Sequence, residues 1–334
     1  MKAMILKKFA PIEQNPLELV DLPDPEAGPE DILIRNRVCG VCHTDLHTIE
    51  GELPQVKLPI IPGHQVVGIV EKKGESASRF KKGERVGVAW LYSACGQCSF
   101  CHEGKENLCE NARFTGYHVN GGYAQFTAIP EKFAYAIPKE FSDEQASPLL
   151  CAGIIGYRSL RLSEVKPGQR LALYGFGASA HVVIQIAIRW RCKVYVFSRS
   201  KEHQALAREL GADWTGTAKD EPPSKVDSAI IFAPAGELVP DALRVLEKGG
   251  TLALAGIYMT PIPEMDYVKY IYHERTIRSV ANATREDGEG LLRIAAEIPI
   301  RTTTQLFPLE EATRALQLLK AGKINGAAVL KISD

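Results

Sequence analysis

Four cysteines within fifteen residues are the feature that most constrains this chain. They are Cys95, Cys98, Cys101 and Cys109, with two residues between each of the first three and seven before the last. Four thiolates this close can form a tetrahedral zinc site from one loop, and an iron–sulfur cluster is the main chemical alternative. A closed four-thiolate site leaves no coordination position for a substrate, so we expect its metal to be structural.

Length and charge favour a two-domain protein that acts on small molecules. The 334 residues suggest two domains at roughly 150 residues each. The 40 Lys and Arg residues balance 40 Asp and Glu residues, which gives a formal net charge of zero. Such a chain lacks the broad positive field of nonspecific nucleic-acid binding, so we expect no nucleic-acid partner.

Two segments bear on localisation. Residues 1–10 carry three lysines among few apolar residues, which is too charged for the core of a signal peptide. Residues 171–188 are uncharged and just long enough to span a membrane, but they include glycines and polar residues and have the pattern of a buried strand followed by a glycine turn. We therefore predict a cytoplasmic protein with no membrane span.

The other cysteines occur beside histidines in three separate motifs. These are Cys39-Gly-Val-Cys42-His43-Thr44-Asp45-Leu-His47, Pro-Gly-His64-Gln65 and Pro-Leu-Leu-Cys151-Ala-Gly. Taken alone, none of them proves metal binding, because the first cysteine pair could belong to a zinc ribbon or act as a redox pair. A ribbon with Cys95 and Cys98 would leave Cys101 and Cys109 without a role, and a redox pair would not explain the adjoining His and Asp residues.

Residues 170–197 have the pattern of a dinucleotide-binding βαβ unit. An apolar strand over 170–174 leads into Gly175-x-Gly177-x-x-Ala180, then an apolar helix to about 190 and a strand over 193–197. Glycines at this turn let the backbone approach a pyrophosphate at the helix N-terminus. Alternation continues with helices over 201–210 and 236–246 and strands over 226–232 and 251–255, which predicts an α/β Rossmann fold with a doubly wound parallel sheet.

The end of the second strand of this unit favours NADP over NAD. Dehydrogenases that prefer NAD usually place Asp or Glu there to bind the ribose 2′-hydroxyl. This chain has Ser198, Arg199 and Lys201 instead, a set of donors and cations suited to a 2′-phosphate. The alternative is that Arg199 and Lys201 simply begin a solvated helix.

Together, these motifs resemble the zinc-containing alcohol dehydrogenases of the medium-chain dehydrogenase/reductase family over nearly the whole chain. The resemblance is carried by residues 40–47, Gly63-His64, the four-cysteine loop, residues 149–153 and the glycine fingerprint. It implies that Cys42, His64 and Cys151 ligate a catalytic zinc with an open fourth position, and that the four-cysteine loop holds a structural zinc.

The resemblance also assigns roles to neighbours of these ligands. Asp45 would orient His64, although an exposed turn aspartate is the alternative. Thr44 and His47 would relay a proton through the cofactor ribose, while a surface histidine is the plain interpretation of His47. His43 would contact the cofactor pyrophosphate or simply be solvated.

Three further positions bear on the size of the substrate, on zinc binding and on cofactor binding: Trp90, Gln65 and Ala327. Trp90 would narrow the substrate pocket in favour of short primary alcohols, although a core tryptophan is the alternative. Many relatives have Glu where Gln65 stands, so zinc affinity or ligand exchange should differ. Relatives often carry Arg where Ala327 stands, and its loss should weaken cofactor binding unless Lys323 or His43 compensates.

We therefore expect a mainly β catalytic domain with a partly open, GroES-like barrel over 1–152 and 282–334, and a Rossmann domain over 153–281, with the site between them. The implied function is reversible oxidation of alcohols to aldehydes or ketones by a homodimer or homotetramer with two zinc ions and NADP or NAD. The alternatives are a cinnamyl-type aldehyde reductase and a noncatalytic zinc-binding interaction protein. Cys151 disfavours a polyol dehydrogenase, which usually has a carboxylate there.

Overall fold

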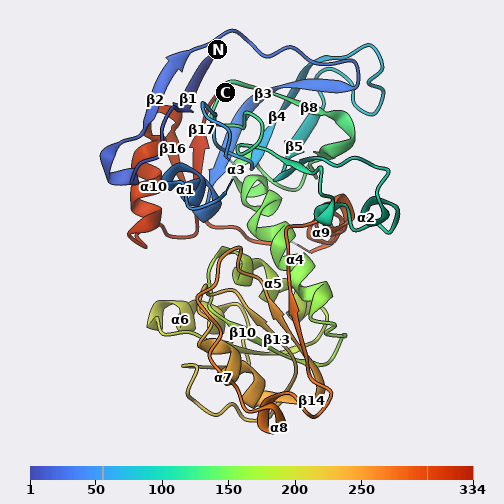
Figure 1. Ribbon diagram of the computed structural model, residues 1–334, viewed down its shortest axis with the longest axis vertical. Helices are drawn as coiled ribbons and strands as arrows, with labels where there is room; N and C mark the ends of the chain where they lie inside the picture. The colour runs from blue at the N-terminus through green and yellow to red at the C-terminus, as the bar shows by residue number, and fades with distance from the viewer. Residues whose placement is uncertain (55, 299, 334) are drawn as a thin grey trace. The chain divides into compact units, whose positions relative to one another are not determined.

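The computed structural model describes residues 1–334 except 55, 299 and 334, and the chain divides into two compact units (Figure 1). The first unit comprises Met1–Cys151, Thr284–Arg293 and Arg301–Asp334. The second unit comprises Ala152–Ala283 and Ile294–Ile300. Each unit has its own sheet system, so the two are described separately.

The first unit is built mainly from β-strands. Its seven-stranded sheet has the order β16-β17-β3-β4-β5-β9, with β8 also paired to β3. The strands of this sheet are β3 (Asp31–Val41), β4 (Val66–Lys73), β5 (Arg85–Val88), β8 (Phe126–Pro130), β9 (Ala134–Ala136), β16 (Thr304–Pro308) and β17 (Ala327–Lys331). Two small antiparallel pairs accompany it: β1 (Lys2–Leu6) with β2 (Leu17–Asp21), and β6 (Leu91–Ser93) with β7 (Arg113–Phe114).

Short helices connect these strands. They are α1 (His43–Glu50), α2 (Ser99–His102), α3 (Asp143–Ala146), α10 (Ala312–Lys320) and the start of α9 (Arg285–Glu297), with the 3-10 helices η1 (Ile12–Gln14), η2 (Glu106–Leu108), η3 (Glu131–Phe133), η4 (Ser147–Leu150) and η5 (Leu309–Glu311). The core is rich in β-branched and aromatic side chains, including Ile32, Ile34 and Val66 from the central strands, as suits a pleated, buried surface.

The second unit is an α/β fold with a six-stranded parallel sheet. The strand order is β12-β11-β10-β13-β14-β15, and every neighbouring pair is parallel. The strands are β10 (Arg170–Tyr174), β11 (Lys193–Phe197), β12 (Trp214–Gly216), β13 (Val226–Ile231), β14 (Leu246–Leu254) and β15 (Thr276–Ser279). The helices are α4 (Ala152–Leu162), α5 (Ala178–Arg189), α6 (Lys201–Glu209), α7 (Leu238–Val245) and α8 (Tyr267–Tyr270).

The predicted fold class, a doubly wound parallel sheet beside a mainly β domain, is confirmed. Residues 171–174 are fully buried, as expected for a strand covered on both faces. One strand differs from expectation: β14 begins at Leu246 rather than near 251, because Leu246 pairs with Val226 before a register shift. Among the described residues, no helix has the length and apolarity that a membrane span requires.

Candidate functional site

Cys42 lies at the junction of β3 and α1, and the local sequence fixes its thiol there. It is the N-cap of α1, and its Sγ accepts a hydrogen bond from the Thr44 backbone N–H at 3.4 Å. In return, Asp45 Oδ2 accepts one from the Cys42 N–H at 2.9 Å, which completes a capping box. The cap places a sulfur ligand at a defined position at the end of a buried strand.

The three residues predicted to ligate a catalytic zinc come together from distant parts of the first unit. Cys42 Sγ lies 3.4 Å from His64 Nε2 and 3.9 Å from Cys151 Sγ, and His64 Nε2 lies 3.4 Å from Cys151 Sγ. All three ligand atoms lie within 4.8 Å of one another. Two sulfurs and one imidazole nitrogen are the donor set of a zinc site with a fourth position left for substrate, so these residues fit a zinc ion.

His64 is oriented by a buried carboxylate. Its Nδ1 lies 3.1 Å from Asp45 Oδ1, which also accepts a hydrogen bond from the Gly63 N–H at 3.1 Å. Burial alone would lower the pKa of His64, but the charge of Asp45 and the contact with Cys42 outweigh it and raise this pKa to about 10. The Nδ1 contact leaves Nε2 facing the two sulfurs. Asp45 is 2% exposed and is therefore no solvated turn residue.

Gln65 is buried directly after His64. Its backbone carbonyl accepts hydrogen bonds from the Gly40 N–H at 3.0 Å and from Ser147 Oγ at 2.7 Å. A Cβ on Gly40 would lie only 2.8 Å from the Gln65 Oε1 atom, so the absence of a side chain at Gly40 makes room for the amide. The Gln65 Nε2 atom makes no hydrogen bond to a described residue.

Trp90 lies against the ligand histidine as part of an aromatic cluster. Its ring is edge-on to His64 with 4.9 Å between centroids, stacked on Phe114 at 5.2 Å and tilted against Tyr117 at 5.6 Å. Trp90 is half-buried, so part of its side chain is accessible to solvent. Phe114 and Tyr117 were not predicted from the sequence, where the only indication of the cluster is the density of aromatic residues between 114 and 118.

The three polar residues predicted to move protons or bind cofactor share the first turns of α1. Thr44 is half-buried and follows Cys42 by two positions. His43 and His47 are four residues apart, and their ring centroids are 6.5 Å from each other. His47 Nδ1 also contacts the Glu52 carboxylate.

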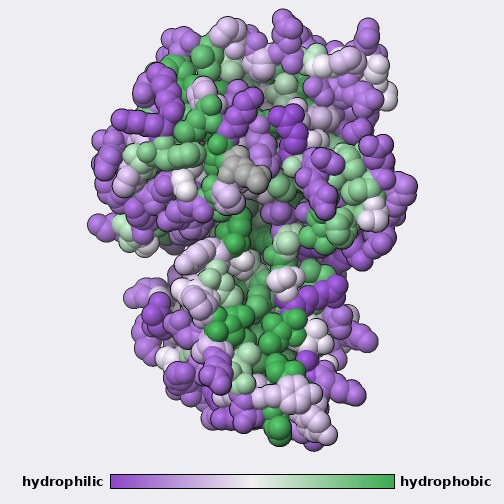
Figure 2. Space-filling model, in the orientation of Figure 1, coloured by the Kyte–Doolittle hydropathy of each residue, from purple (hydrophilic) through white to green (hydrophobic). Residues whose placement is uncertain are grey.

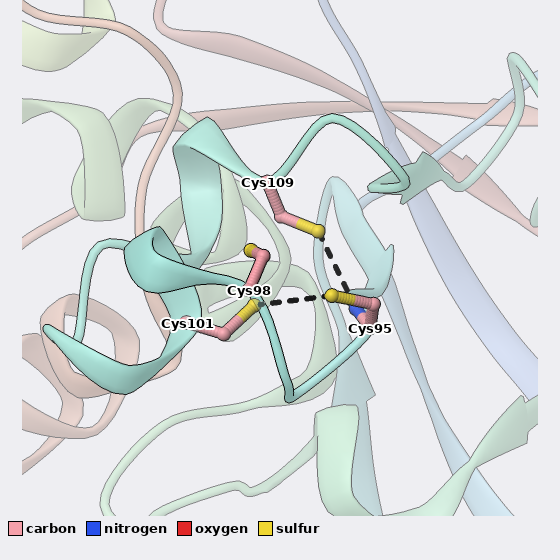
Figure 3. A group of neighbouring side chains, drawn as sticks. All are labelled: Cys95, Cys98, Cys101 and Cys109. Atoms are coloured by element: carbon pink, nitrogen blue, oxygen red, sulfur yellow. Dashed lines mark hydrogen bonds between the residues drawn. The ribbon is translucent and has the colours of Figure 1, made fainter.

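The four cysteines of the loop converge as their spacing predicts (Figure 3). Their sulfurs lie within 4.8 Å of one another, with Cys95 and Cys101 at 3.9 Å. The Cys95 N–H also donates to Cys109 Sγ at 3.4 Å. Hydrogen bonds from the backbone of Gln97 and Cys98 lower the pKa of Cys95 to about 6, which favours a thiolate ligand. Four convergent sulfurs fit a closed zinc site.

The glycine fingerprint forms the turn between β10 and α5. Gly175 has a φ of +85°, which L side chains rarely adopt, and a Cβ there would lie 3.1 Å from the Ala233 nitrogen. Gly177 is the N-cap of α5, and a Cβ on it would meet nothing within 4 Å. Ala180 is fully buried in the first turn of the helix. The free N–H groups of this helix end suit a phosphate.

The residues predicted to favour NADP over NAD follow the end of β11. Ser198 is buried, and its N–H donates to the Gly216 carbonyl at 2.8 Å while its own carbonyl accepts from Gln204 Nε2 at 2.7 Å. These bonds fix the backbone at the strand end. The side chains of Arg199 and Lys201 are exposed at the start of α6.

A parallel dinucleotide-type sheet together with an open Cys, His and Cys cluster defines a zinc-assisted, nicotinamide-dependent dehydrogenase. Comparison with known proteins agrees. Residues 28–139 match the family described as the alcohol dehydrogenase GroES-like domain, and residues 180–297 match the zinc-binding dehydrogenase family.

Relatives and solved structures extend the match over the whole chain. The sequence is 46% identical to the "Probable alcohol dehydrogenase AdhA" of Mycobacterium tuberculosis, covering 99% of this chain and 97% of that protein. It is 34% identical to an alcohol dehydrogenase of Geobacillus stearothermophilus, covering 99% of this chain and all of the relative. The solved alcohol dehydrogenase of Aeropyrum pernix is 28% identical, with a TM-score of 0.87 over 99% of this chain and 100% of that one.

The "CAD" of Helicobacter pylori, solved "complexed with NADP(H)", is 25% identical, with a TM-score of 0.86 over 99% of both chains.

This chain belongs to the zinc-containing alcohol dehydrogenases of the medium-chain dehydrogenase/reductase family. The family and the enzyme class predicted from the motifs are thereby confirmed.

Proposed function

We propose that this alcohol dehydrogenase interconverts primary alcohols and aldehydes, with two zinc ions per chain and a preference for NADP. The observation that carries the proposal is the convergence of Cys42, His64 and Cys151 on one point, with ligand atoms within 4.8 Å. Zinc held there would supply a Lewis acid that polarises an alcohol or carbonyl oxygen. The four-cysteine loop would hold the second, structural zinc.

The chain's own residues position the ligands and move the proton. The Asp45 carboxylate fixes the orientation of His64, so that its Nε2 faces the two sulfurs. The Thr44 hydroxyl, two residues after Cys42, is suited to accept the proton that an alcohol loses. His47 can pass that proton on to solvent, because an imidazole can both accept and donate a proton.

The second unit would bind the cofactor, which supplies the hydride acceptor or donor. The turn at Gly175 and Gly177 presents the N-terminus of α5 to a pyrophosphate. Ser198, Arg199 and Lys201 favour a 2′-phosphate, since they offer donors and positive charge at the end of β11. His43 would add a donor to the pyrophosphate, which would offset the lack of an arginine at Ala327.

Short primary alcohols are the proposed substrates because the half-buried Trp90 lies 4.9 Å from His64 and would narrow the site. Aromatic alcohols, as in a cinnamyl-type reductase, are the second candidate. The observation that favours them is the cluster of Trp90, Phe114 and Tyr117, which offers ring surfaces for stacking.

We also propose a homodimer or homotetramer formed through the sheet of the second unit. The strand β15 is the last in that sheet. Near it, Tyr267, Val268 and Tyr272 of α8 and the turn that follows are exposed. Figure 2 shows apolar side chains at the surface of this unit, on the face where Figure 1 labels α7, α8 and β14.

Metal analysis and parallel rate assays test the proposal. We expect about two zinc ions per chain, and faster reduction of short linear aldehydes with NADPH than with NADH. Cys151→Ala should lose one zinc and all turnover while keeping the far-ultraviolet circular dichroism of the parent. Retained turnover would remove Cys151 from the ligand set, and faster rates with aromatic aldehydes would favour the second candidate.

A further inference from the structure

One acidic residue of the four-cysteine loop, Glu106, is buried, whereas the other acidic residues near it are exposed. Glu106 lies in η2 between Cys101 and Cys109 and is only 7% exposed. The nearby Glu103 and Glu110 are exposed, and Glu103 pairs with the exposed Lys105. A buried carboxylate is costly unless it is paired and hydrogen-bonded, so its partner should matter to the loop.

That partner is Arg285, 179 residues further along the chain. Arg285 Nε lies 2.9 Å from both carboxylate oxygens of Glu106, and its terminal nitrogen lies 2.5 Å from Oε2. The Arg285 backbone N–H also donates to Oε1 at 2.8 Å. A two-oxygen ion pair reinforced by a backbone bond is specific in geometry as well as favourable.

Arg285 is the first residue of α9, so the pair acts on the start of that helix. The first N–H groups of a helix lack partners within it, and a negative charge near them is favourable. Asp287 Oδ2 accepts from the Thr284 N–H at 3.0 Å and from its hydroxyl at 2.8 Å. Glu106 accepts a hydrogen bond from the next backbone N–H, that of Arg285. This second carboxylate belongs to the four-cysteine loop, whereas Asp287 belongs to the helix itself.

The same turn of α9 is packed against the end of the first unit's sheet. The Arg285 guanidinium carbon lies 4.6 Å from the centroid of the Phe133 ring, a cation–π contact. A Cβ on Gly288 would lie 2.4 Å from the Tyr135 ring, so β9 and α9 approach closely at this position. These contacts hold the start of α9 in place. A shift of the four-cysteine loop would therefore separate Glu106 from Arg285.

We infer that Glu106 is a positioning residue that couples metal occupancy of the four-cysteine site to the docking of α9. The inference rests on the proposed structural zinc. With metal bound, Cys101 and Cys109 hold η2 where Glu106 meets Arg285. Without it, the loop is free to move and the start of α9 loses its anion. Since such coupling is reciprocal, breaking the ion pair must also loosen the metal.

Zinc release and hydrogen exchange test this coupling on the full-length, zinc-loaded protein. The Cys151→Ala background keeps only the four-cysteine zinc, so its transfer to a chromogenic chelator reports on that site alone. Glu106→Gln should release zinc at least tenfold faster and raise amide exchange over 284–293. Removing zinc from the background protein should raise exchange in the same segment. Glu103→Gln is the matched control from the same loop and should stay within twofold in both measurements.

Arg285→Lys gives a second readout if Glu106→Gln fails to fold. It keeps the charge but loses the two-oxygen geometry, so its zinc release should lie between that of the background and tenfold faster. Zinc release and exchange unchanged from the background in every folded variant would overturn the inference while leaving the zinc site intact. A background protein that binds no zinc would overturn the proposed structural site as well.

Discussion

Asp45 contacts two of the three residues proposed to hold the catalytic zinc, Cys42 and His64. One carboxylate oxygen accepts from His64 and Gly63, and the other accepts from the Cys42 N–H. It therefore orients one ligand and fixes the backbone of another. This double role explains why a charged residue is 2% exposed in the core of the first unit.

We expect Asp45→Asn to weaken zinc binding at the Cys42, His64 and Cys151 site by roughly 10- to 100-fold, because an amide is a poorer acceptor for the His64 Nδ1–H. Competition with a chelator of known affinity measures the change. The four-cysteine site, which Asp45 does not touch in the structure, is the internal control. Equal losses at both sites would mean that the substitution unfolds the first unit instead of loosening one ligand.

Residues close in sequence were predictable, and those brought together by the fold were less so. Cys95, Cys98, Cys101 and Cys109 must lie near one another because one short loop carries them. Cys42, His64 and Cys151 could be grouped only through the family resemblance, since spacing alone cannot bring three distant segments together. Glu106 resembled any charged loop residue, because its burial depends on an arginine 179 positions away.

At the scale of elements, the two glycines of the turn between β10 and α5 have different roles. Gly175 adopts a backbone conformation that other residues avoid, whereas Gly177 leaves space at the proposed cofactor site. Gly177→Ala places a methyl group where no protein atom lies within 4 Å, at the N-cap of α5. We expect an unchanged urea midpoint but at least tenfold weaker NADPH binding, because the methyl group would occupy the approach of the pyrophosphate. Fluorescence titration with NADPH measures the affinity.

Gly175→Ala is the control for that turn. Its φ of +85° strains any L side chain, so this variant should lose roughly 1 kcal/mol of stability in addition to any effect on binding. Unchanged NADPH affinity in Gly177→Ala would show that the space at the end of α5 holds no phosphate.

The strands β10 and β13 are joined by an ion pair whose contribution depends on pH. Arg170 Nε lies 3.1 Å from Asp227 Oδ2, and the Arg170 N–H donates to the same oxygen at 2.9 Å. Burial alone would raise the pKa of Asp227, but the bonds from Arg170 outweigh it and lower this pKa below its usual value. The pair therefore stabilises the fold above the carboxyl's unfolded pKa of about 3.9 and loses its effect as pH falls through the folded value.

We expect Asp227→Asn to lower the free energy of unfolding at pH 7 by about 1.5–3 kcal/mol, the usual range for hydrogen bonds to a charged group. Urea denaturation at pH 7 and at pH 3 measures the difference from the parent protein. The difference between the two proteins should be smaller at pH 3, because the unfolded carboxyl is then largely protonated and the stabilisation is lost as pH falls toward the lowered folded pKa. A difference that stays the same at both pH values would show that packing, and not charge, accounts for the loss.

The regular elements of the second unit were predictable because each has a clear local pattern. Lys193–Phe197 is the strand expected from its apolar run, and α5 ends one residue before the predicted limit at 190. The start of β14 was not predictable, because it depends on pairing between Leu246 and Val226 across a register shift. Local pattern sets the type of an element, and partners in the sheet set its length.

At the scale of the whole molecule, an edge strand has to be covered or protected. β15 pairs with β14 on one side, and the Val280 N–H, just beyond the strand, donates to the Leu254 carbonyl at 2.9 Å. Since successive N–H groups along a strand point to opposite sides, those of Ile277 and Ser279 point away from β14. Such a row of donors and acceptors is a template for another strand, and a second copy in antiparallel orientation would use the same residues on both sides.

Ser279→Pro removes one outward N–H and leaves the bonds to β14 in place, so it should weaken assembly without unfolding the second unit. We expect the mass from light scattering to fall by at least half relative to the parent protein, while Ser279→Ala keeps the parent mass. Circular dichroism checks that the fold is intact. An unchanged mass for the folded proline variant would show that the copies meet at a surface other than β15, and the exposed side chains of α8 would be the next to change.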